Sequence, residues 1–203
     1  MSGDGHLVSP RWTAWRAATD LDEYESRFTT AAAHGEADLI CGFGPRSVLD
    51  AGCGTGRVAI ELHRRGVESV GVDLDDEMLE RARRRAPDVT WTCADLATFR
   101  LDRCFDVVAM PGNVLLYCRD EVRAAVVERC AAHVAEAGLL IAGFTLSDDA
   151  GSHTLSAHDD ACREVGFELA HRWATWDRAP FDARGRGDRY AVSVHRRVGA
   201  PRP

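Results

Sequence analysis

The stretch SVLDAGCGTGRVAIEL, residues 47–62, constrains the fold more than any other part of this chain. It begins as a short apolar run, passes through glycines at alternate positions (Gly52, Gly54 and Gly56), and continues with the apolar spacing of an amphipathic helix. Glycines between a strand and a helix let the backbone turn sharply and approach a ligand through its N–H groups. The pattern predicts an α/β domain with a ligand-binding loop after its first strand.

Strand-like and helix-like segments alternate after this loop. A strand is expected at residues 47–51, before the loop. After it, strands are expected at residues 67–73, 89–95, 105–110 and 139–146, and helices at residues 55–66, 75–87, 119–138 and 154–166. Such alternation indicates a parallel sheet with helices on both faces. The last two strands, residues 167–176 and 189–197, have no helix between them and must be antiparallel. We expect an α/β fold with a doubly wound, mostly parallel, seven-stranded Rossmann-like sheet, a C-terminal antiparallel strand pair and an N-terminal helical cover.

The length of the chain suits a single domain over residues 1–203. Residues 1–19 have little periodicity and are interpreted as an N-terminal arm. Residues 20–41 have the spacing of an amphipathic helix, interrupted at Gly35, and are expected to form the helical cover. Residues 42–197 then form the Rossmann-like core.

The composition excludes several kinds of partner. A formal net charge of −7 argues against binding of nucleic acid through its phosphates. No apolar run is long enough to span a membrane, and the first residues lack the pattern of a signal peptide. Seven cysteines without a C-x-x-C pair indicate reduced thiols. We expect a cytoplasmic monomer or homodimer that binds neither nucleic acid nor membrane; the absence of lysine beside abundant alanine and arginine suggests a bacterial source.

Two kinds of ligand remain compatible with the glycine loop. The pattern G-x-G-x-x-A from Gly54 fits a dinucleotide, with Asp73 placed 19 residues later as a ribose-binding acid. The pattern G-x-G-x-G from Gly52 fits a different ligand. Asp50 separates the two, because a carboxylate at the mouth of the loop would repel a pyrophosphate. It suits a ligand that presents an ammonium and a sulfonium, and S-adenosylmethionine has both.

Acids also end the next two expected strands. Asp73 can accept hydrogen bonds from both ribose hydroxyls through its two carboxylate oxygens. Asp95 is placed to accept a hydrogen bond from the adenine N6 amine. Leu74 and Met78 are expected to flank the faces of the adenine.

The motifs VLDAGCGTGR, VGVDLDDEML, CADL and FDVVAMPGNVLLY resemble the successive motifs of class I S-adenosylmethionine-dependent methyltransferases, over about residues 20–197. The resemblance implies an enzyme that uses S-adenosyl-L-methionine as its cofactor. The expected cofactor contacts are Tyr24, Asp50, Gly52, Cys53, Gly54, Gly56, Asp73, Leu74, Met78, Asp95, Leu96 and Pro111. For Gly56 and Tyr24 a plain packing role is the alternative, and Cys53 is interpreted as a small residue of the loop rather than a nucleophile.

The acceptor side of the site is less readable. A general base is needed only if the acceptor must lose a proton, so no catalytic residue is assigned. The residue types and the places of five side chains make them candidates for contacting a small-molecule acceptor: Asn113, Tyr117, His153, Trp176 and Arg178. The connection at residues 177–189 is either a lid or an ordinary hairpin loop. No histidine or cysteine spacing demands a metal, so none is predicted.

Two alternatives stay open beside methyl transfer to a small molecule. One is a nicotinamide-dependent reductase, which Asp50, Asp95 and the terminal strand pair disfavour and for which no lysine is available as a proton relay. The other is a catalytically silent regulatory protein that binds S-adenosylmethionine.

Overall fold

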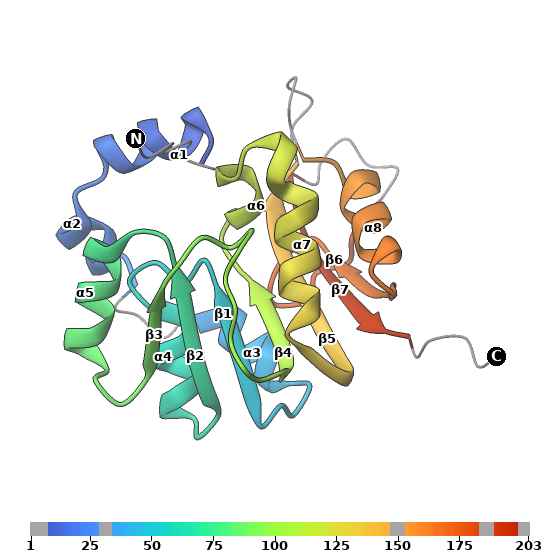
Figure 1. The fold of residues 1–203 in the computed structure, drawn as a ribbon, viewed down its shortest axis with the longest axis horizontal. Coiled ribbons are helices and arrows are strands. Elements are labelled where there is room, and N and C mark those ends of the chain that lie inside the picture. Colours follow the sequence, from blue (N-terminus) through green and yellow to red (C-terminus); the bar gives the residue numbers. More distant parts are fainter. Residues whose placement is uncertain (1–7, 29–33, 147–152, 183–188, 199–203) are drawn as a thin grey trace.

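The computed structural model describes residues 8–28, 34–146, 153–182 and 189–198. Its centre is a seven-stranded sheet with the order β3-β2-β1-β4-β5-β7-β6 (Figure 1). The strands are β1 (Ser47–Ala51), β2 (Glu68–Asp73), β3 (Thr90–Cys93), β4 (Phe105–Met110), β5 (Val134–Thr145), β6 (Phe167–Trp173) and β7 (Tyr190–Arg197). Neighbouring strands from β3 to β5 are parallel, whereas β7 is antiparallel to both β5 and β6. The expected fold class is confirmed.

Helices cover both faces of this sheet. They are α1 (Pro10–Ala18), α2 (Leu21–Ser26), α3 (Gly35–Cys41), α4 (Arg57–Arg64), α5 (Asp76–Arg85), α6 (Val114–Tyr117), α7 (Arg123–Ala132) and α8 (Leu155–Glu164), with a 3-10 turn at Asp120–Val122. α7 and α8 lie on one face, α3 and α4 lie on the other, and α1 and α2 lie beyond the carboxyl ends of β1 and β2 (Figure 1). Within the described ranges, no helix has both the length and the apolar character needed to cross a membrane.

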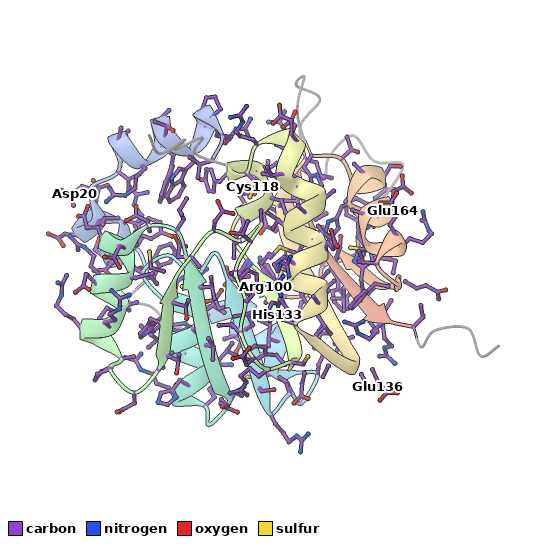
Figure 2. The ribbon with its side chains drawn as sticks, viewed as in Figure 1. Asp20, Arg100, Cys118, His133, Glu136 and Glu164 are labelled. Carbon is purple, nitrogen blue, oxygen red and sulfur yellow. The ribbon has the colours of Figure 1, made fainter. Side chains whose placement is uncertain are left out.

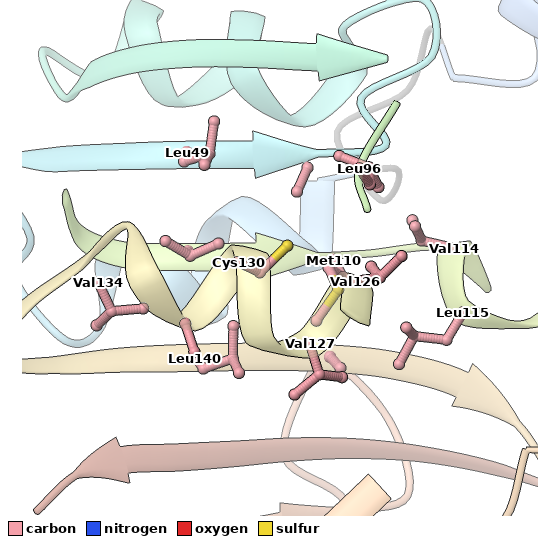
Figure 3. Close-up of a cluster of buried hydrophobic side chains, with 14 of the residues drawn as sticks. Leu49, Leu96, Met110, Val114, Leu115, Val126, Val127, Cys130, Val134 and Leu140 are labelled. Atoms are coloured by element: carbon pink, nitrogen blue, oxygen red, sulfur yellow. The ribbon is translucent and has the colours of Figure 1, made fainter. Parts of the chain in front are cut away.

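Successive side chains of a strand point to opposite faces of the sheet, so the core is divided between these two faces. Val48 packs with residues of α3 and α4, whereas its neighbour Leu49 points to the opposite side. Figure 3 shows Leu49 in the same cluster as Leu140 of β5 and Cys130 of α7, and all three are fully buried. This two-sided burial explains why the parallel strands are short, continuous apolar runs.

The N-terminal segment is more ordered than the sequence suggested. Pro10–Ala18 form α1 where we expected part of an arm, because Pro10 suits the first helical turn and the Ser9 hydroxyl accepts a hydrogen bond from the Trp12 N–H. The Ser9 N–H also donates to the carbonyl oxygen of Tyr117 at 2.7 Å. Residues 1–7 lie outside the described residues. Ser9 therefore attaches the start of α1 to α6.

The expected helical cover over residues 20–41 contains two helices with different roles. α2 begins after Asp20, whose carboxylate accepts hydrogen bonds from the N–H groups of Asp22 and Glu23 (Figure 2). α3 packs its buried Leu39 and Ile40 against the sheet instead of covering the carboxyl edge. The cover is consequently α1 together with α2.

The helix expected at residues 119–138 is shorter than predicted. α7 ends at Ala132, and β5 already begins at Val134. His133 ends the helix because its Nδ1–H donates to the Arg129 carbonyl at 2.8 Å and its Nε2 accepts from the Leu101 N–H at 3.0 Å. Val134 then pairs with Phe105, and this tertiary pairing overrides the helical periodicity of the sequence.

Candidate cofactor and acceptor site

A cavity of about 250 Å³ opens where β1, β2 and β4 end. The loop after β1 and the ends of β2 and β3 form its floor, and side chains from α1, α2 and α6 form its roof. Every expected cofactor contact lines this cavity except Gly56. The topology explains the place, since the strand order reverses between β1 and β4 and ligands bind at such a reversal.

Asp50 is the most unusual group of the floor. Its side chain is 1% exposed; Oδ2 accepts a hydrogen bond from the Ala59 N–H at 3.0 Å, and Oδ1 has no partner within the described part of the chain. Burial raises the pKa of this carboxyl to about 7, against a smaller opposing effect of the Ala59 N–H. Asp50 therefore lies beneath the loop rather than at an open mouth. A buried oxygen without a partner on the cavity wall suits a cationic ligand group.

Gly52 and Gly54 are glycines for steric reasons. Both adopt left-handed backbone conformations, with φ of 78° and 55°. A Cβ on Gly52 would lie 2.6 Å from Val114 Cγ2, and a Cβ on Gly54 would lie 3.1 Å from Met78 Cε. Only a residue without a side chain leaves this part of the cavity open.

Gly56 has a different surrounding. It precedes α4 with φ of 80°, and a Cβ there would lie 2.4 Å from Trp91 Cη2 and 3.0 Å from Ala82 Cβ. Gly56 thus permits α4 to pack closely against β3 and α5. The packing role, which the sequence left open, accounts for this glycine without any contact to a ligand.

Asp73 ties the glycine loop to the end of β2. Its Oδ2 accepts a hydrogen bond from the Gly54 N–H at 2.7 Å, and its Oδ1 accepts one from the Asp75 N–H at 2.9 Å. Burial raises the pKa of this carboxyl. Each carboxylate oxygen keeps a second lone pair, so a ligand diol can still be accepted.

Asp95 follows β3 and lines the same cavity. Its Oδ1 accepts a hydrogen bond from the Ala97 N–H at 2.7 Å, which fixes the turn after the strand. Leu74, which is 38% exposed, and the buried Met78 lie nearby on the wall. An acid with two apolar side chains suits a flat, nitrogen-bearing ring.

The roof is a group of aromatic side chains that we call the aromatic roof: Trp12, Trp15, Tyr24 and Tyr117. Ring centroids of Trp12 and Trp15 are 5.1 Å apart, and Tyr117 lies 5.3 Å from Trp12. Trp15 also contacts Tyr24 edge-on at 5.6 Å. The sequence predicted Tyr24 and Tyr117 but missed both tryptophans. Their spacing of three residues was the available signal, because it places them on one helix face.

Arg57 was also missed by the sequence analysis. It lines the cavity, forms a two-pronged ion pair with Glu36 of α3, and stacks over the Phe28 ring at 4.7 Å. The Glu36 and Arg57 side chains are only 14% and 16% exposed. This pair connects α4 with α3 and places a positive charge near Asp50.

The five expected acceptor contacts do not lie together, and only Tyr117 among them lines the cavity. Asn113 has φ of 71° and accepts a hydrogen bond from the Thr145 N–H at 2.7 Å, so it joins the ends of β4 and β5. His153 is buried, and its ring centroid lies 4.9 Å from that of Phe144. The Trp176 indole N–H donates to the Tyr190 hydroxyl at 3.2 Å, and Arg178 lies over Trp173. Residues 183–188 of the expected lid lie outside the described residues.

Fold and cavity together define a class of protein. An open α/β sheet with a glycine loop, three acids at successive strand ends and an aromatic roof is a Rossmann-like domain whose cavity suits a small ligand with a ribose and a cationic group. Asp106, at the opposite end of β4, has a structural role, since its carboxylate accepts hydrogen bonds from the N–H groups of Arg46 and Ser47.

Comparison with known proteins supports the assignment to this class. Residues 48–138 match the family described as Methyltransferase domain. The chain is similar to dTDP-3-amino-3,4,6-trideoxy-alpha-D-glucopyranose N,N-dimethyltransferase of Streptomyces venezuelae, with 34% identity over 108 residues, which are 52% of this chain and 46% of that protein. It is also similar to magnesium-protoporphyrin O-methyltransferase of Rhodobacter capsulatus, with 32% identity over 119 residues and 52% of each chain covered.

A solved structure extends the likeness to nearly the whole chain. The TehB-like SAM-dependent methyltransferase of Corynebacterium glutamicum ATCC 13032 Kitasato superposes with a TM-score of 0.74 and 26% identity, covering 93% of this chain and 95% of that one. The chain spans about half the length of the curated relatives it matches. These findings confirm the resemblance to class I S-adenosylmethionine-dependent methyltransferases, whose methyltransferase domain is matched over residues 48–138.

Proposed function

We propose that this protein binds S-adenosyl-L-methionine in the cavity and transfers its methyl group to a small-molecule acceptor. The observation that carries the proposal is the unpartnered Oδ1 of Asp50, buried beside a loop that must be glycine at Gly52 and Gly54. When bound, the cofactor supplies an electrophilic methyl group on a cationic sulfur. Asp50 then offers its free oxygen to the positive end of the cofactor, and Asp73 accepts from the ribose hydroxyls.

Side chains of this protein bind and enclose the reactants. Asp95 accepts a hydrogen bond from the adenine amine, with Leu74, Met78 and Leu96 as apolar neighbours. The aromatic roof excludes water from the reacting centre, and positioning the acceptor accounts for much of the acceleration. We infer that Tyr117, which lies in the roof over the end of β4, contacts the acceptor.

Three titratable side chains that line the cavity, Tyr24, Tyr117 and Cys118, offer no ready general base. Burial raises the pKa of the Tyr24 and Tyr117 hydroxyls, and it raises the pKa of the Cys118 thiol to about 12. These groups keep their protons at neutral pH. That favours an acceptor whose attacking atom need not lose a proton before the attack, such as a neutral amine. The similarity to an amino-sugar N,N-dimethyltransferase supports this direction.

The location, source and partners of the protein are inferred from its composition and from the organisms of the similar proteins. We infer a cytoplasmic bacterial enzyme, a monomer or homodimer, that works on free small molecules without a nucleic acid or a membrane as partner. The acidic net charge of −7 supports the absence of nucleic acid, and the organisms of the similar proteins support the source.

Calorimetry followed by a product assay tests the proposal. Purified protein is titrated with S-adenosylmethionine, S-adenosylhomocysteine and NADH, and formation of S-adenosylhomocysteine is then measured over a panel of amines, carboxylates and phenols. We expect binding of the first two ligands and turnover with at least one acceptor. Tight binding of NADH alone would establish the reductase alternative, and cofactor binding without turnover on any acceptor would favour the silent regulator.

A further inference from the structure

Three potential metal ligands meet between α8 and the sheet, away from the cavity. His158 and Cys162 lie one turn apart on α8, and His195 lies on β7. One donor atom from each residue lies within 4.8 Å of the other two. All three side chains are buried, with exposures of 0%, 0% and 1%. No metal was predicted from the sequence, because no histidine or cysteine spacing demands one, and His195 is 33 residues away from Cys162 in the chain.

Each imidazole of this group has one nitrogen without a hydrogen-bond partner. Within the described residues, the Nδ1 atoms of His158 and His195 are buried without a partner, and so is Nε2 of the neighbouring His153. The rings are close, with centroids of His158 and His195 5.1 Å apart and those of His153 and His158 5.4 Å apart. A buried nitrogen without a partner is costly to desolvate, and an ion bound by His195 Nδ1 would remove one such cost.

We propose that His158, Cys162 and His195 bind a zinc ion. Two imidazoles and one thiol, with no direct oxygen ligand, favour zinc over magnesium or calcium. His158 Nε2 lies 3.8 Å from Cys162 Sγ. Tetrahedral zinc with bonds of about 2.1 Å to nitrogen and 2.3 Å to sulfur separates such ligands by roughly 3.6 Å. The existing distance needs only a small adjustment.

Groups around the three ligands suit this role. Asp159 Oδ1 lies 3.0 Å from His195 Nε2, so that ring donates to a carboxylate and keeps Nδ1 as its free nitrogen. A carboxylate behind a ligating histidine is common at zinc sites. Asp159 also pairs with Arg172, which offsets part of its negative charge.

The binding step is balanced without any redox partner. The S–H bond of Cys162 breaks, a zinc–sulfur bond forms, and the proton passes to solvent. His158 and His195 contribute lone pairs from nitrogen. The fourth position would be taken by a water molecule.

This site is independent of the proposed methyl transfer. None of the three ligands lines the cavity. Zinc here would fasten α8 to β7, and through β7 to β5 and β6, at the C-terminal edge of the sheet. Its role is therefore structural, and its removal should lower stability while leaving cofactor affinity in the folded protein nearly unchanged.

Zinc binding to the full chain tests the proposal directly. Protein stripped with a chelator and returned to buffer is titrated with zinc chloride, and bound metal is measured after gel filtration. We expect about one zinc per chain, at least tenfold weaker binding in Cys162→Ser and in His195→Gln, and unchanged binding in Cys130→Ser. Cys130 is an equally buried thiol on α7 outside the group, so it is a matched control.

A second measurement uses no variant. Cobalt(II) added to the wild-type protein should give a thiolate-to-cobalt charge-transfer band and a tetrahedral visible spectrum, both abolished by stoichiometric zinc. Circular dichroism checks that each variant is folded, and a variant that does not fold leaves the decision to the cobalt spectrum. Absence of zinc binding and of the charge-transfer band in wild-type protein would overturn the proposal and leave water as the occupant. Equal binding by wild type and Cys162→Ser would overturn it as well.

Discussion

Asp50→Asn should have opposite effects on stability and on cofactor binding. Burial raises the pKa of Asp50 from 3.8 to about 7, so the folded protein holds this proton more tightly than the unfolded chain does. The stabilising contribution of the protonated Asp50 carboxyl is fully present below pH 4 and is lost as the pH rises through 7. At 1.36 kcal/mol per pKa unit, ionised Asp50 destabilises the ligand-free protein by roughly 4 kcal/mol at pH 8.

The asparagine variant removes that penalty. Its amide oxygen can still accept the hydrogen bond from the Ala59 N–H, and the nearby charges of Arg57, Asp73 and Glu36 stay in place. We expect Asp50→Asn to match wild type near pH 4 and to be more stable at pH 8. At pH 8 the variant should bind S-adenosylmethionine about 10- to 150-fold more weakly, which corresponds to 1.5–3 kcal/mol for a hydrogen bond to a charged group.

Urea unfolding at pH 4.5, 6, 7 and 8, with calorimetry at pH 6 and 8, measures both effects. The gap in stability should widen with pH, and the loss of affinity should be larger at pH 8 than at pH 6. A variant that is less stable than wild type at pH 8 would refute the burial argument. An equal affinity for the cofactor in the two proteins at pH 8 would refute the assignment of Asp50 to its cationic end.

Three further perturbations separate the parts of the site. Asp73→Ala should weaken S-adenosylmethionine binding by about 1.5–3 kcal/mol in a folded protein, measured by calorimetry, and unchanged affinity would remove the ribose assignment. Gly52→Ala should abolish cofactor binding, because its Cβ would clash with Val114 and strain a φ of 78°, whereas Gly44→Ala, at a φ of 67° but with no neighbour within 4 Å, should bind normally. Methyl transfer measured at 25 °C should survive EDTA, since the proposed zinc ligands lie outside the cavity; full loss that zinc restores would place a metal in the reaction.

Much of the fold follows from patterns that physics ties to local structure. The β1 strand was predicted residue for residue, because a buried parallel strand before a glycine loop has few other solutions. The end of α7 was not predictable from periodicity. His133 ends that helix through a hydrogen bond to Leu101, which is distant in the chain, and Val134 leaves it to pair with Phe105. Such contacts exist only after the chain has folded.

The cavity, too, has one part that the sequence predicts and one part that it does not. Its floor could be predicted, since the loop and acids sit at strand ends that the topology brings together. Its roof could not, because Trp12 and Trp15 lie in a segment whose helix depends on the Ser9 cap and on a contact with α6. Trp176 was expected at the cleft because β6 runs parallel to β5. β6 does end at that edge. The Trp176 side chain, however, packs against Gly143 on the face of the sheet that α3 and α4 cover.

Roof and floor are one connected structure. Arg16 of α1 donates to Asp75 Oδ2 at 2.6 Å, and the other oxygen of Asp75 accepts from the Met78 N–H at the start of α5. The Asp75 N–H in turn donates to Asp73, which holds Gly54. A continuous chain of hydrogen bonds therefore leads from α1 to the glycine loop. We expect substitutions in the roof to change cofactor affinity through this chain, so acceptor specificity can be assigned to a roof residue only when its cofactor affinity is measured in the same variant.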